Sequence, residues 1–355
     1  MIKNTRDIGV TLPATLAKSA ESATELYLHS HNLEYVCDLD NLYNGYLSAR
    51  KHKRNKKAIF EFEKDLGRNL EKLSVELKNQ AYKPSKYRTF TIKEPKERLI
   101  VAPTFRDSIV QHTIYNYVYD LFDRSFVHDS YGCRKSKGTH KASQRLQDFM
   151  RECNGDEYYL QLDIKKYYYR INHAILRDAI SRKIDDERLT DLIMLFVNTA
   201  DGIGLYVGNI LSQLFGLIYL NRMDNFIKRV LKVKRYIRYV DDFILIGFSK
   251  EEIYELKRKI EVYIKEHLEL EFSKFRIAKI SKGSNFVGFR TWKSRKFVRK
   301  RSLHNFSKAL KKGKASSLHS MLGHAKHSSS IGYMQSKIKE HENALQIQKE
   351  NNQRC

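Results

Sequence analysis

The sequence predicts an α+β fold, and two patterns support this class. Short apolar segments typical of β-strands alternate with longer segments whose apolar residues recur every three or four positions, as on one face of a helix. Two of the predicted strands also have aspartate at one end, Asp163 in one case and the pair Asp241–Asp242 in the other. With 355 residues, of which 41% are hydrophobic, the chain can form two or three globular subdomains.

The N-terminal part combines helices with one hairpin. Residues 1–33 show little pattern and are left as an unassigned extension, whereas residues 40–80 have the apolar spacing of helices. Residues 87–92 and 99–102 are predicted to be two strands of a hairpin, joined by the segment KEPKER with Pro95 near its turn.

The rest of the chain alternates between helices and strands. A long helix is predicted over residues 108–126, and the strand that follows ends near Asp163. Helical patterns then run to about residue 198. The predicted elements after them are a glycine-led buried helix over 207–231, a strand–turn–strand over 235–248, an amphipathic helix over 250–268 and short strands over 275–292.

The charge balance indicates an anionic partner. Lys and Arg number 66 against 41 Asp and Glu, which gives a net charge of +25. Residues 293–327 contain many Lys and Arg but no Asp or Glu, and this uneven distribution favours contact with a phosphate backbone. A cationic surface kept for solubility is the alternative explanation. Nucleic acid is therefore the first partner to expect.

Cysteines and apolar runs indicate a cytoplasmic protein. The four cysteines show no C-x-x-C spacing, so neither a zinc site nor a disulfide framework is expected. The N-terminus lacks the apolar core of a signal peptide, and no apolar run approaches membrane-spanning length. We expect no membrane partner.

The three strand-end carboxylates are candidate metal ligands. Asp241 and Asp242 lie in the segment RYVDDFILIG, where a charge is costly unless something compensates it. Strand ends from distant parts of a chain can meet at one edge of a sheet, and Asp163 would then repel this pair unless a cation lies among them. Mg²⁺ prefers oxygen ligands, and two such ions roughly 4 Å apart can support phosphoryl transfer. Taken alone, an Asp-Asp pair is more often simple turn chemistry.

Five sequence boxes, in order, resemble those of reverse transcriptases. YVDD, residues 239–242, resembles the family's Tyr-x-Asp-Asp box, and LDIKKYYYRI resembles the box with the first metal-binding aspartate. RLIVAPTFRDSIVQH and SYGCRKSKGTHKA resemble two fingers boxes of bacterial members, and NFVGFR resembles the primer-grip box. The resemblance runs from about residue 87 to residue 292.

This resemblance implies a right-hand polymerase fold of fingers, palm and thumb, with a ferredoxin-like βαββ palm sheet and a helical thumb. The implied domains are fingers, with palm segments, over 34–155, palm over 156–292, and thumb with C-terminal tail over 293–355.

The box VGNILSQ, residues 207–213, is similar to that of one branch of the family. Most reverse transcriptases have Gln-Gly-x-x-x-Ser-Pro here, whereas this chain has Val207 in place of that Gln and Gln213 in place of that Pro. These substitutions are typical of the enzymes of diversity-generating retroelements, which occur in bacteria and phages and are similar to group II intron enzymes. Such enzymes copy a template-repeat RNA with frequent errors at adenines, and the cDNA diversifies a target gene. The implied partners are template RNA, the RNA/cDNA duplex and a small basic accessory variability protein, which is a homopentamer.

By resemblance, the catalytic residues and metal ligands are Asp163 and Asp241, with Asp242 as a supporting member, and two Mg²⁺ ions are the implied cofactor. A primer 3′-hydroxyl would attack the α-phosphate of an incoming dNTP, and pyrophosphate would leave. Arg98 and Lys96 lie on the predicted fingers hairpin, where the family grips the triphosphate. Exposed hairpin charges without a ligand are the alternative.

The remaining nucleotide-binding candidates would surround the dNTP. Tyr168 matches the steric gate that excludes a 2′-hydroxyl, and strand alternation would put Tyr167 and Tyr169 on the opposite face. We hypothesise that the side chain at 207, lacking the usual amide, loosens nucleotide selection. The box VGNILSQ, otherwise a glycine-led turn into a core helix, supplies the candidates Val207, Gly208, Ser212 and Gln213.

Three further sets complete the implied site. Lys274, or alternatively Lys282, is a candidate general acid for pyrophosphate, although a surface lysine is the plainer interpretation. Phe286 and Gly288 belong to the primer-grip box, where glycine would let the primer backbone come close. The candidate contacts to the template–primer backbone are Arg295, Arg299, Lys300, Arg301 and Lys308.

Other functions are compatible with parts of this pattern. The nearest is a different bacterial reverse transcriptase, of an abortive-infection or antiphage type. A non-catalytic RNA-binding protein with the same fold is disfavoured by the intact Asp163, Asp241 and Asp242. A metal-dependent nuclease lacks support from the ordered boxes.

Overall fold

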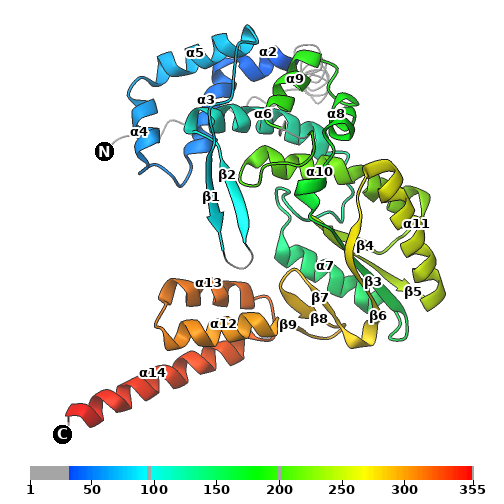
Figure 1. The fold of residues 1–355 in the computed structure, drawn as a ribbon. Coiled ribbons are helices and arrows are strands. Elements are labelled where there is room, and N and C mark those ends of the chain that lie inside the picture. Colours follow the sequence, from blue (N-terminus) through cyan, green and yellow to red (C-terminus); the bar gives the residue numbers. More distant parts are fainter. Residues whose placement is uncertain (1–31, 94–96, 198–201, 354–355) are drawn as a thin grey trace, which may run out of the picture. The chain divides into compact units, whose positions relative to one another are not determined.

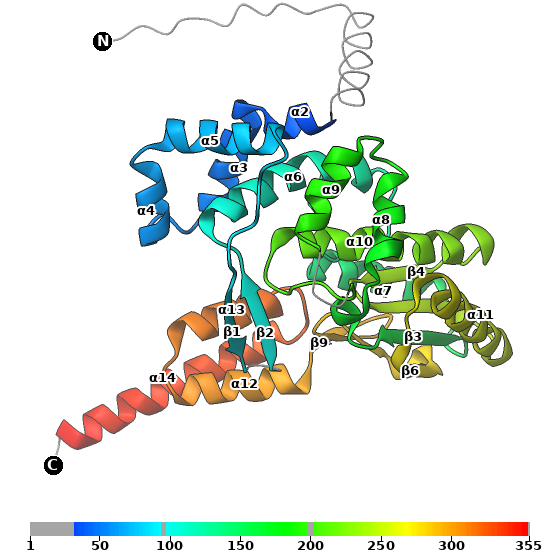
Figure 2. The ribbon, with the colours of Figure 1, turned by 45° about the horizontal axis from the view of Figure 1, so that its top comes forward.

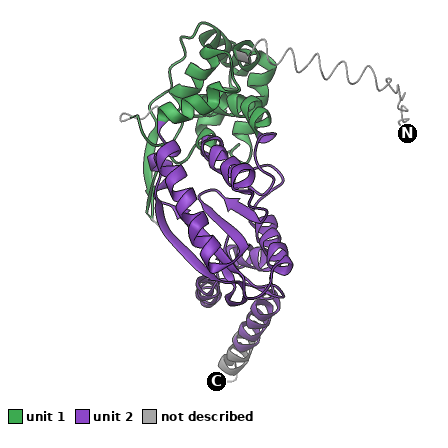
Figure 3. Cartoon of the chain, turned by 90° about the vertical axis from the view of Figure 1, so that its right-hand side faces the viewer, with its two compact units in different colours: residues 1–122, 173–212 green, residues 123–172, 213–355 purple. Residues whose placement is uncertain are grey.

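The computed structural model of the chain describes residues 32–93, 97–197 and 202–353. It divides into two compact units, each made of separate stretches of sequence (Figure 3). Unit 1 consists of residues 1–122 and 173–212, and unit 2 of residues 123–172 and 213–355. The predicted KEPKER turn, with Pro95 and Lys96, lies outside the described residues.

Unit 1 is mainly helical and has one two-stranded hairpin. Helix α3 begins directly after Asp38, whose carboxylate accepts hydrogen bonds from the backbone N–H groups of Asp40 and Asn41. Strands β1 and β2 pair antiparallel, with Phe90 opposite Ile100. The elements of this unit are α2 (Asn32–Cys37), α3 (Leu39–Arg50), α4 (Lys57–Glu63), α5 (Leu66–Lys78), β1 (Arg88–Ile92), β2 (Arg98–Ala102), α6 (Phe105–Asp123), α8 (His173–Ser181) and α9 (Glu187–Leu195).

Unit 2 is built on a four-stranded antiparallel sheet with the order β4-β5-β3-β6. Along the chain, α8, α9 and α10 lie between β3 and β4, and α11 lies between β5 and β6. With the strand order, this gives the ferredoxin-like arrangement (Figure 1). The sheet elements are β3 (Tyr158–Ile164), α10 (Ile210–Asn225), a π-helical turn η2 (Phe226–Val230), β4 (Tyr236–Tyr239), β5 (Asp242–Phe248), α11 (Lys250–Leu268) and β6 (Phe272–Lys279).

Helices cover both faces of this sheet, with α7 (Thr139–Glu152) on one side and α11 on the other (Figures 1 and 2). Tyr159, Ile244 and Ile246 pack with apolar residues of α7 in one buried cluster. The alternate residues, such as Leu160 and Phe243, are equally inaccessible to solvent. The apolar run FILI in β5 is therefore explained by burial on both faces.

Helix α11 shows how closely local sequence sets an element's bounds. Ser249 and Glu252 form a reciprocal capping box at its N-terminus. Glu269 ends it in a left-handed conformation. The structure confirms the helix predicted over residues 250–268.

The C-terminal part of unit 2 adds a small three-stranded sheet and three helices. Phe289, Val298, Phe306 and Met334 share one buried cluster, which joins the small sheet to the helices. The predicted α+β class and the helical C-terminal region are confirmed. Its elements are η3 (Ile280–Lys282), β7 (Ser284–Phe286), β8 (Phe289–Thr291), β9 (Lys296–Val298), α12 (Lys300–Lys311), α13 (Ala315–Ala325) and α14 (Ile331–Gln353), whereas the turn η1 (Tyr167–Arg170) follows β3. Of the helices described in either unit, none is both long and apolar enough to cross a membrane.

Candidate active site

Two of the predicted carboxylates lie side by side at one edge of the four-stranded sheet. The register places Asp163 of β3 opposite Asp242 of β5 on one side and opposite Lys274 of β6 on the other. Directly opposed residues have Cβ atoms about 5 Å apart, so these three side chains form one row across the sheet. Asp241 occupies the turn before β5, and its carbonyl accepts a hydrogen bond from the Ile164 N–H at 3.3 Å. The sheet thus brings the three residues that the sequence singled out to one edge, with Asp163 and Asp242 directly opposed.

Asp242 is half-buried and its charge is poorly compensated. Burial raises the pKa of Asp242 to about 7, and the negative charge of Asp163 adds to this shift. A hydrogen bond from Gln161 Nε2 to Asp242 Oδ1, at 2.9 Å, acts in the opposite direction. The same amide also donates to the Asn285 carbonyl at 3.0 Å, which fixes its orientation. A cation at this edge would stabilise the ionised form of Asp242.

Asp163 has a basic neighbour in the same row. Lys274 Nζ lies 3.3 Å from Asp163 Oδ2, and the lysine side chain is 73% exposed. An ion pair this open contributes little to stability, so Lys274 can exchange this partner for another anion. Lys282, the alternative general acid, lies in the exposed turn η3.

A groove of about 760 Å³ in unit 2 is lined by Asp163 and Asp242 and by several basic side chains. The positive charge of Arg299 is close enough to lower the pKa of Asp242. Trp292 lies in the same groove with the guanidinium of Arg290 4.9 Å from its ring centre and that of Arg295 5.6 Å away. The charged groove residues are Asp163, Asp242, Lys274, Arg276, Arg290, Arg299, Lys300 and Arg301. A groove with this lining fits a polyanion whose reacting end reaches the carboxylates.

The tyrosine triplet after β3 does not alternate as a strand would. Lys166 has a positive φ of 47°, and residues 167–170 form a 3₁₀ turn. Tyr167 is buried, Tyr168 half-buried and Tyr169 exposed, so the prediction that Tyr167 and Tyr169 share the face opposite Tyr168 is wrong. Successive residues of a 3₁₀ turn point about 120° apart.

Tyr168 is held close to the carboxylates. Burial raises the pKa of its hydroxyl, and the neighbouring Cys133 thiol and Asp241 carboxylate add to the shift. Gly216 of α10 leaves room for the ring, because a Cβ there would lie 3.1 Å from Tyr168 Cε1. The carbonyl of Gly216 accepts the Tyr167 hydroxyl at 2.5 Å, which anchors the turn.

The NFVGFR box contributes mainly to the core. Phe286 is fully buried in the cluster beneath α7, so its ring is inaccessible to a ligand. Gly288 has a φ of +90°, and a Cβ there would lie 3.0 Å from Nε2 of His324. The close neighbour of this glycine is therefore a histidine of α13. Any contact of this box with a primer falls to its backbone or to Asn285 and Arg290, which line the groove.

In unit 1 the loop that carries Val207 and Gly208 packs against the hairpin. The Val207 carbonyl accepts a hydrogen bond from the Val101 N–H of β2 at 2.9 Å. Gly208 has a φ of +129°, and a Cβ there would lie 2.8 Å from Ile100 Cγ2, so the loop needs glycine at this position. Arg98 begins the same strand and is exposed. Lys96 lies outside the described residues.

The remaining box residues begin helix α10. The Ser212 hydroxyl donates to the Tyr206 carbonyl at 2.6 Å, and the Ser212 N–H is capped by Asn209 Oδ1 at 2.6 Å. Ser212 is buried and stabilises the loop, whereas Gln213, the first residue of the following segment of unit 2, is exposed. The predicted backbone contacts Arg295, Lys300, Arg301 and Lys308 are exposed, and Arg299 is half-buried.

The comparison with protein families agrees with this geometry. The model of the family described as reverse transcriptase (RNA-dependent DNA polymerase) matches residues 83–291, which is more than half of the chain. This chain belongs to the reverse transcriptase family. The match contains the carboxylate row, the hairpin and the VGNILSQ box, and it confirms the predicted right-hand polymerase fold.

Individual relatives of this reverse transcriptase are distant. The group II intron-encoded protein LtrA of Lactococcus lactis subsp. cremoris is 25% identical over 296 residues, covering 62% of this chain and 49% of LtrA. Protein YkfC of Escherichia coli K12 is 24% identical over 280 residues, covering 66% of this chain and 72% of that protein. The chain thus spans about half the length of LtrA. Among solved structures, telomerase from Candida albicans aligns at a TM-score of 0.47 and 14% identity, covering 63% of this chain and 46% of that one.

The carboxylate row of this reverse transcriptase suits a hard cation. In the described part of the chain, no set of three or more His, Cys, Asp or Glu side chains is already arranged as a metal site. Two observations nevertheless fit Mg²⁺. The donors are carboxylate oxygens, which this ion prefers, and Asp242 has a raised pKa that a nearby cation would lower.

Sequence reasoning missed several residues that build the site. Gln161 alternates with Asp163 on β3, and this spacing could have identified it as a neighbour of the carboxylates. Trp292 and Arg276 reach the groove through long-range packing that no local pattern reveals. Arg238 directly precedes the YVDD box, and an arginine inside an apolar run was a signal of a buried partner.

Proposed function

We propose that this chain is an RNA-directed DNA polymerase that extends a primer 3′-hydroxyl along an RNA template. One observation carries the proposal. Asp163 and Asp242 are paired across β3 and β5 and line a groove that is also lined by arginine and lysine. Template-directed nucleotidyl transfer requires both carboxylates that bind metal ions and basic side chains that bind a phosphate backbone.

The residues take separate roles in this proposal. Asp163 and Asp241, supported by Asp242, would hold two Mg²⁺ ions, which when bound neutralise the triphosphate and make the primer hydroxyl more acidic. The primer 3′-hydroxyl would lose its proton to water as its oxygen forms a bond to the α-phosphorus, the bond from that phosphorus to the bridging oxygen would break, and pyrophosphate would leave. Lys274, opposite Asp163 on β6, would give a proton to pyrophosphate.

Selection of the nucleotide falls to the other predicted residues. Arg98 would bind the triphosphate through its forked guanidinium. The Tyr168 ring, held by its contact with Gly216, would exclude a 2′-hydroxyl and so favour dNTPs. The exposed basic residues Arg295, Lys300, Arg301 and Lys308, with Arg299, would bind the template–primer backbone.

The proposed biological role is mutagenic copying in a diversity-generating retroelement of a bacterium or phage. Val207 and Gln213 support it, because the family's common box has Gln and Pro there. In this role the template is a template-repeat RNA, the product is cDNA with errors at adenines, and a homopentameric accessory variability protein is a partner in the cytoplasm. The enzyme would then combine an ordinary carboxylate site with an altered nucleotide-selection loop.

The test is dNTP incorporation on primed poly(rA) with Mg²⁺, comparing the wild type with an Asp241→Ala, Asp242→Ala variant. We expect incorporation by the wild type and a loss on the order of 10³-fold or more in the variant, because removing carboxylates that bind the ions costs several kcal/mol. Sequencing products from a mixed-sequence RNA then tests for errors at adenines. Equal incorporation by both proteins, or no incorporation by the wild type even with accessory protein and cognate RNA, would refute the polymerase proposal.

A further inference from the structure

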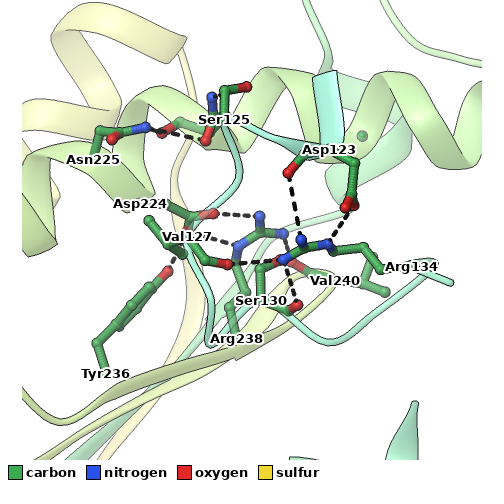
Figure 4. A network of polar contacts seen from close by, with 12 residues as sticks. Asp123, Ser125, Val127, Ser130, Arg134, Asp224, Asn225, Tyr236, Arg238 and Val240 are labelled. Atoms are coloured by element: carbon green, nitrogen blue, oxygen red, sulfur yellow. Dashed lines mark hydrogen bonds and ion pairs between the residues drawn. The ribbon is translucent and has the colours of Figure 1, made fainter. Parts of the chain in front are cut away.

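A buried guanidinium lies beneath the turn that carries Asp241 and Asp242. Arg238, the last residue but one of β4, is fully buried. Its Nε donates to Asp224 Oδ1 at 2.7 Å and its Nη2 to Asp224 Oδ2 at 2.5 Å, which is a bidentate pair with α10 (Figure 4). The Tyr236 hydroxyl donates to Asp224 Oδ1 at 2.5 Å. Every oxygen of this inaccessible carboxylate therefore has a partner.

The third arm of Arg238 leaves this pair and reaches the turn. Its Nη1 donates to the Val240 carbonyl at 2.9 Å (Figure 4). Val240 has a φ of +59°, a conformation that is unfavourable for a β-branched residue. The carbonyl that Arg238 binds thus belongs to the strained residue directly before Asp241.

Neighbouring backbone also keeps the turn in this shape. The Arg238 N–H donates to the Asp129 carbonyl at 3.0 Å, and the Tyr131 N–H donates to the Arg238 carbonyl at 2.9 Å. Gly132 follows directly, and a Cβ there would lie 2.6 Å from Val240 Cγ2. The SYGCRKSKG segment therefore packs against the YVDD turn, and Arg238 is the side chain that links that turn to α10.

Stability alone does not explain this arrangement. A buried ion pair is often no more stabilising than well-packed apolar residues of similar volume. Strained backbone persists where its surroundings hold it, and such places cluster at functional sites. The contact to Val240 is the part of the network that an apolar replacement cannot reproduce.

We propose that Arg238 is a positioning residue, which with Asp224 and Tyr236 holds the Val240 turn so that the Asp241 and Asp242 carboxylates face the metal site. The inference rests on the proposed role of these aspartates. Arg238 touches neither substrate nor metal in this proposal, and acts only through the turn.

The main test is an all-apolar network, Arg238→Met with Asp224→Leu and Tyr236→Phe. This variant leaves no charge or hydroxyl of the network buried without a partner, so we expect it to fold. We expect kcat to fall by on the order of 10- to 100-fold, as for a small misplacement of reacting groups. The Mg²⁺ concentration for half-maximal rate should rise, and the KM for template–primer should stay near the wild-type value.

Two further variants separate positioning from a structural role. Arg238→Lys is the test to use if the apolar variant does not fold. It keeps the buried charge, but a single ammonium cannot hold both the Asp224 carboxylate and the Val240 carbonyl, so the Mg²⁺ dependence should change in the same direction. Lys257→Met is the control. Lys257 is a mostly buried cation of unit 2, on α11, bound to Glu261 Oε2 at 2.8 Å. Its loss should leave the Mg²⁺ dependence unchanged.

Hydrogen exchange of the 236–246 peptide supplies a measurement that does not need activity. Faster exchange there in the Arg238 variants than in Lys257→Met supports the proposal, even if the wild type proves inactive and the polymerase proposal fails. Wild-type exchange in the folded apolar variant, or wild-type kcat and Mg²⁺ dependence, would overturn it.

Discussion

In unit 2 the candidate residues are fixed by sheet register and buried charge, whereas in unit 1 they lie on an exposed hairpin and a glycine-led loop. Asp163 and Asp242 are opposed across two strands that are buried on both faces. Arg98 extends from a two-stranded hairpin most of whose residues are exposed, and Val207 is tied to that hairpin through backbone.

This difference separates chemistry from selection. A two-stranded ribbon has little stability of its own, so residues on it can adjust to what they bind. A carboxylate row on a buried sheet cannot adjust without disturbing the core. We therefore expect substitutions in the carboxylate row to act on kcat, and those in the hairpin and the Val207 loop to act on dNTP affinity and choice.

The largest effect that would sharpen this comparison is expected from Arg98→Ala. Loss of a charge-assisted hydrogen bond costs about 1.5–3 kcal/mol, so the KM for dNTP should rise roughly 10- to 100-fold with little change in kcat. Steady-state kinetics on primed poly(rA) measures both. Arg88→Ala is the matched control, since Arg88 is an exposed arginine at the other end of the same hairpin. An equal rise in the control, or a fall in kcat alone, would contradict the assignment.

A smaller effect is expected from Val207→Gln. The backbone of Val207 holds β2 and its side chain is only half-buried, so the substitution should leave the fold intact. An added amide that hydrogen-bonds the nucleotide is worth about 0.5–1.5 kcal/mol, and errors opposite template adenine should fall roughly 2- to 10-fold. Val207→Met tests side-chain size without the amide. If sequenced products show the same error spectrum in all three proteins, the loop does not act through this contact.

How much of the fold and of the candidate site could be predicted from sequence depends on how far apart in the chain the contacting residues lie. The carboxylates were predictable because each lies at the end of an apolar strand, and the capping box of α11 is written within four residues. The tyrosine triplet was not, since the change from strand to 3₁₀ turn depends on Lys166 in a left-handed conformation, and no glycine or proline signals it.

Longer-range features were beyond the same reasoning. The groove brings residues near 161 together with residues near 300, and the pairing of Arg238 with Asp224 joins a helix to a strand. An arginine in an apolar run predicts that a partner exists but does not identify it. Gly288 is a similar example. Its sequence box predicts space for a primer backbone, but the neighbour that comes close is His324, which lies in a helix later in the chain.

The last prediction concerns protein stability and contrasts a buried cation of unit 2 with a half-buried base of unit 1. Unit 2 buries Arg238 with a carboxylate partner, whereas in unit 1 burial, and then the positive charge of Lys53, lower the pKa of His112 to about 4. The unfolded state, with an ordinary His pKa near 6.5, binds the proton more readily, so stability is lost as pH falls from about 6.5 toward 4. From pH 6.5 to 5 the loss of folding stability is roughly 1–2 kcal/mol, or a few degrees of Tm.

The Tm of His112→Gln should fall less than that of the wild type over this pH interval. His319→Gln, at an exposed histidine of α13, should follow the wild type. Parallel curves of Tm against pH for the wild type and His112→Gln would contradict this prediction, because His112 would then bind its proton equally well in the folded and the unfolded state.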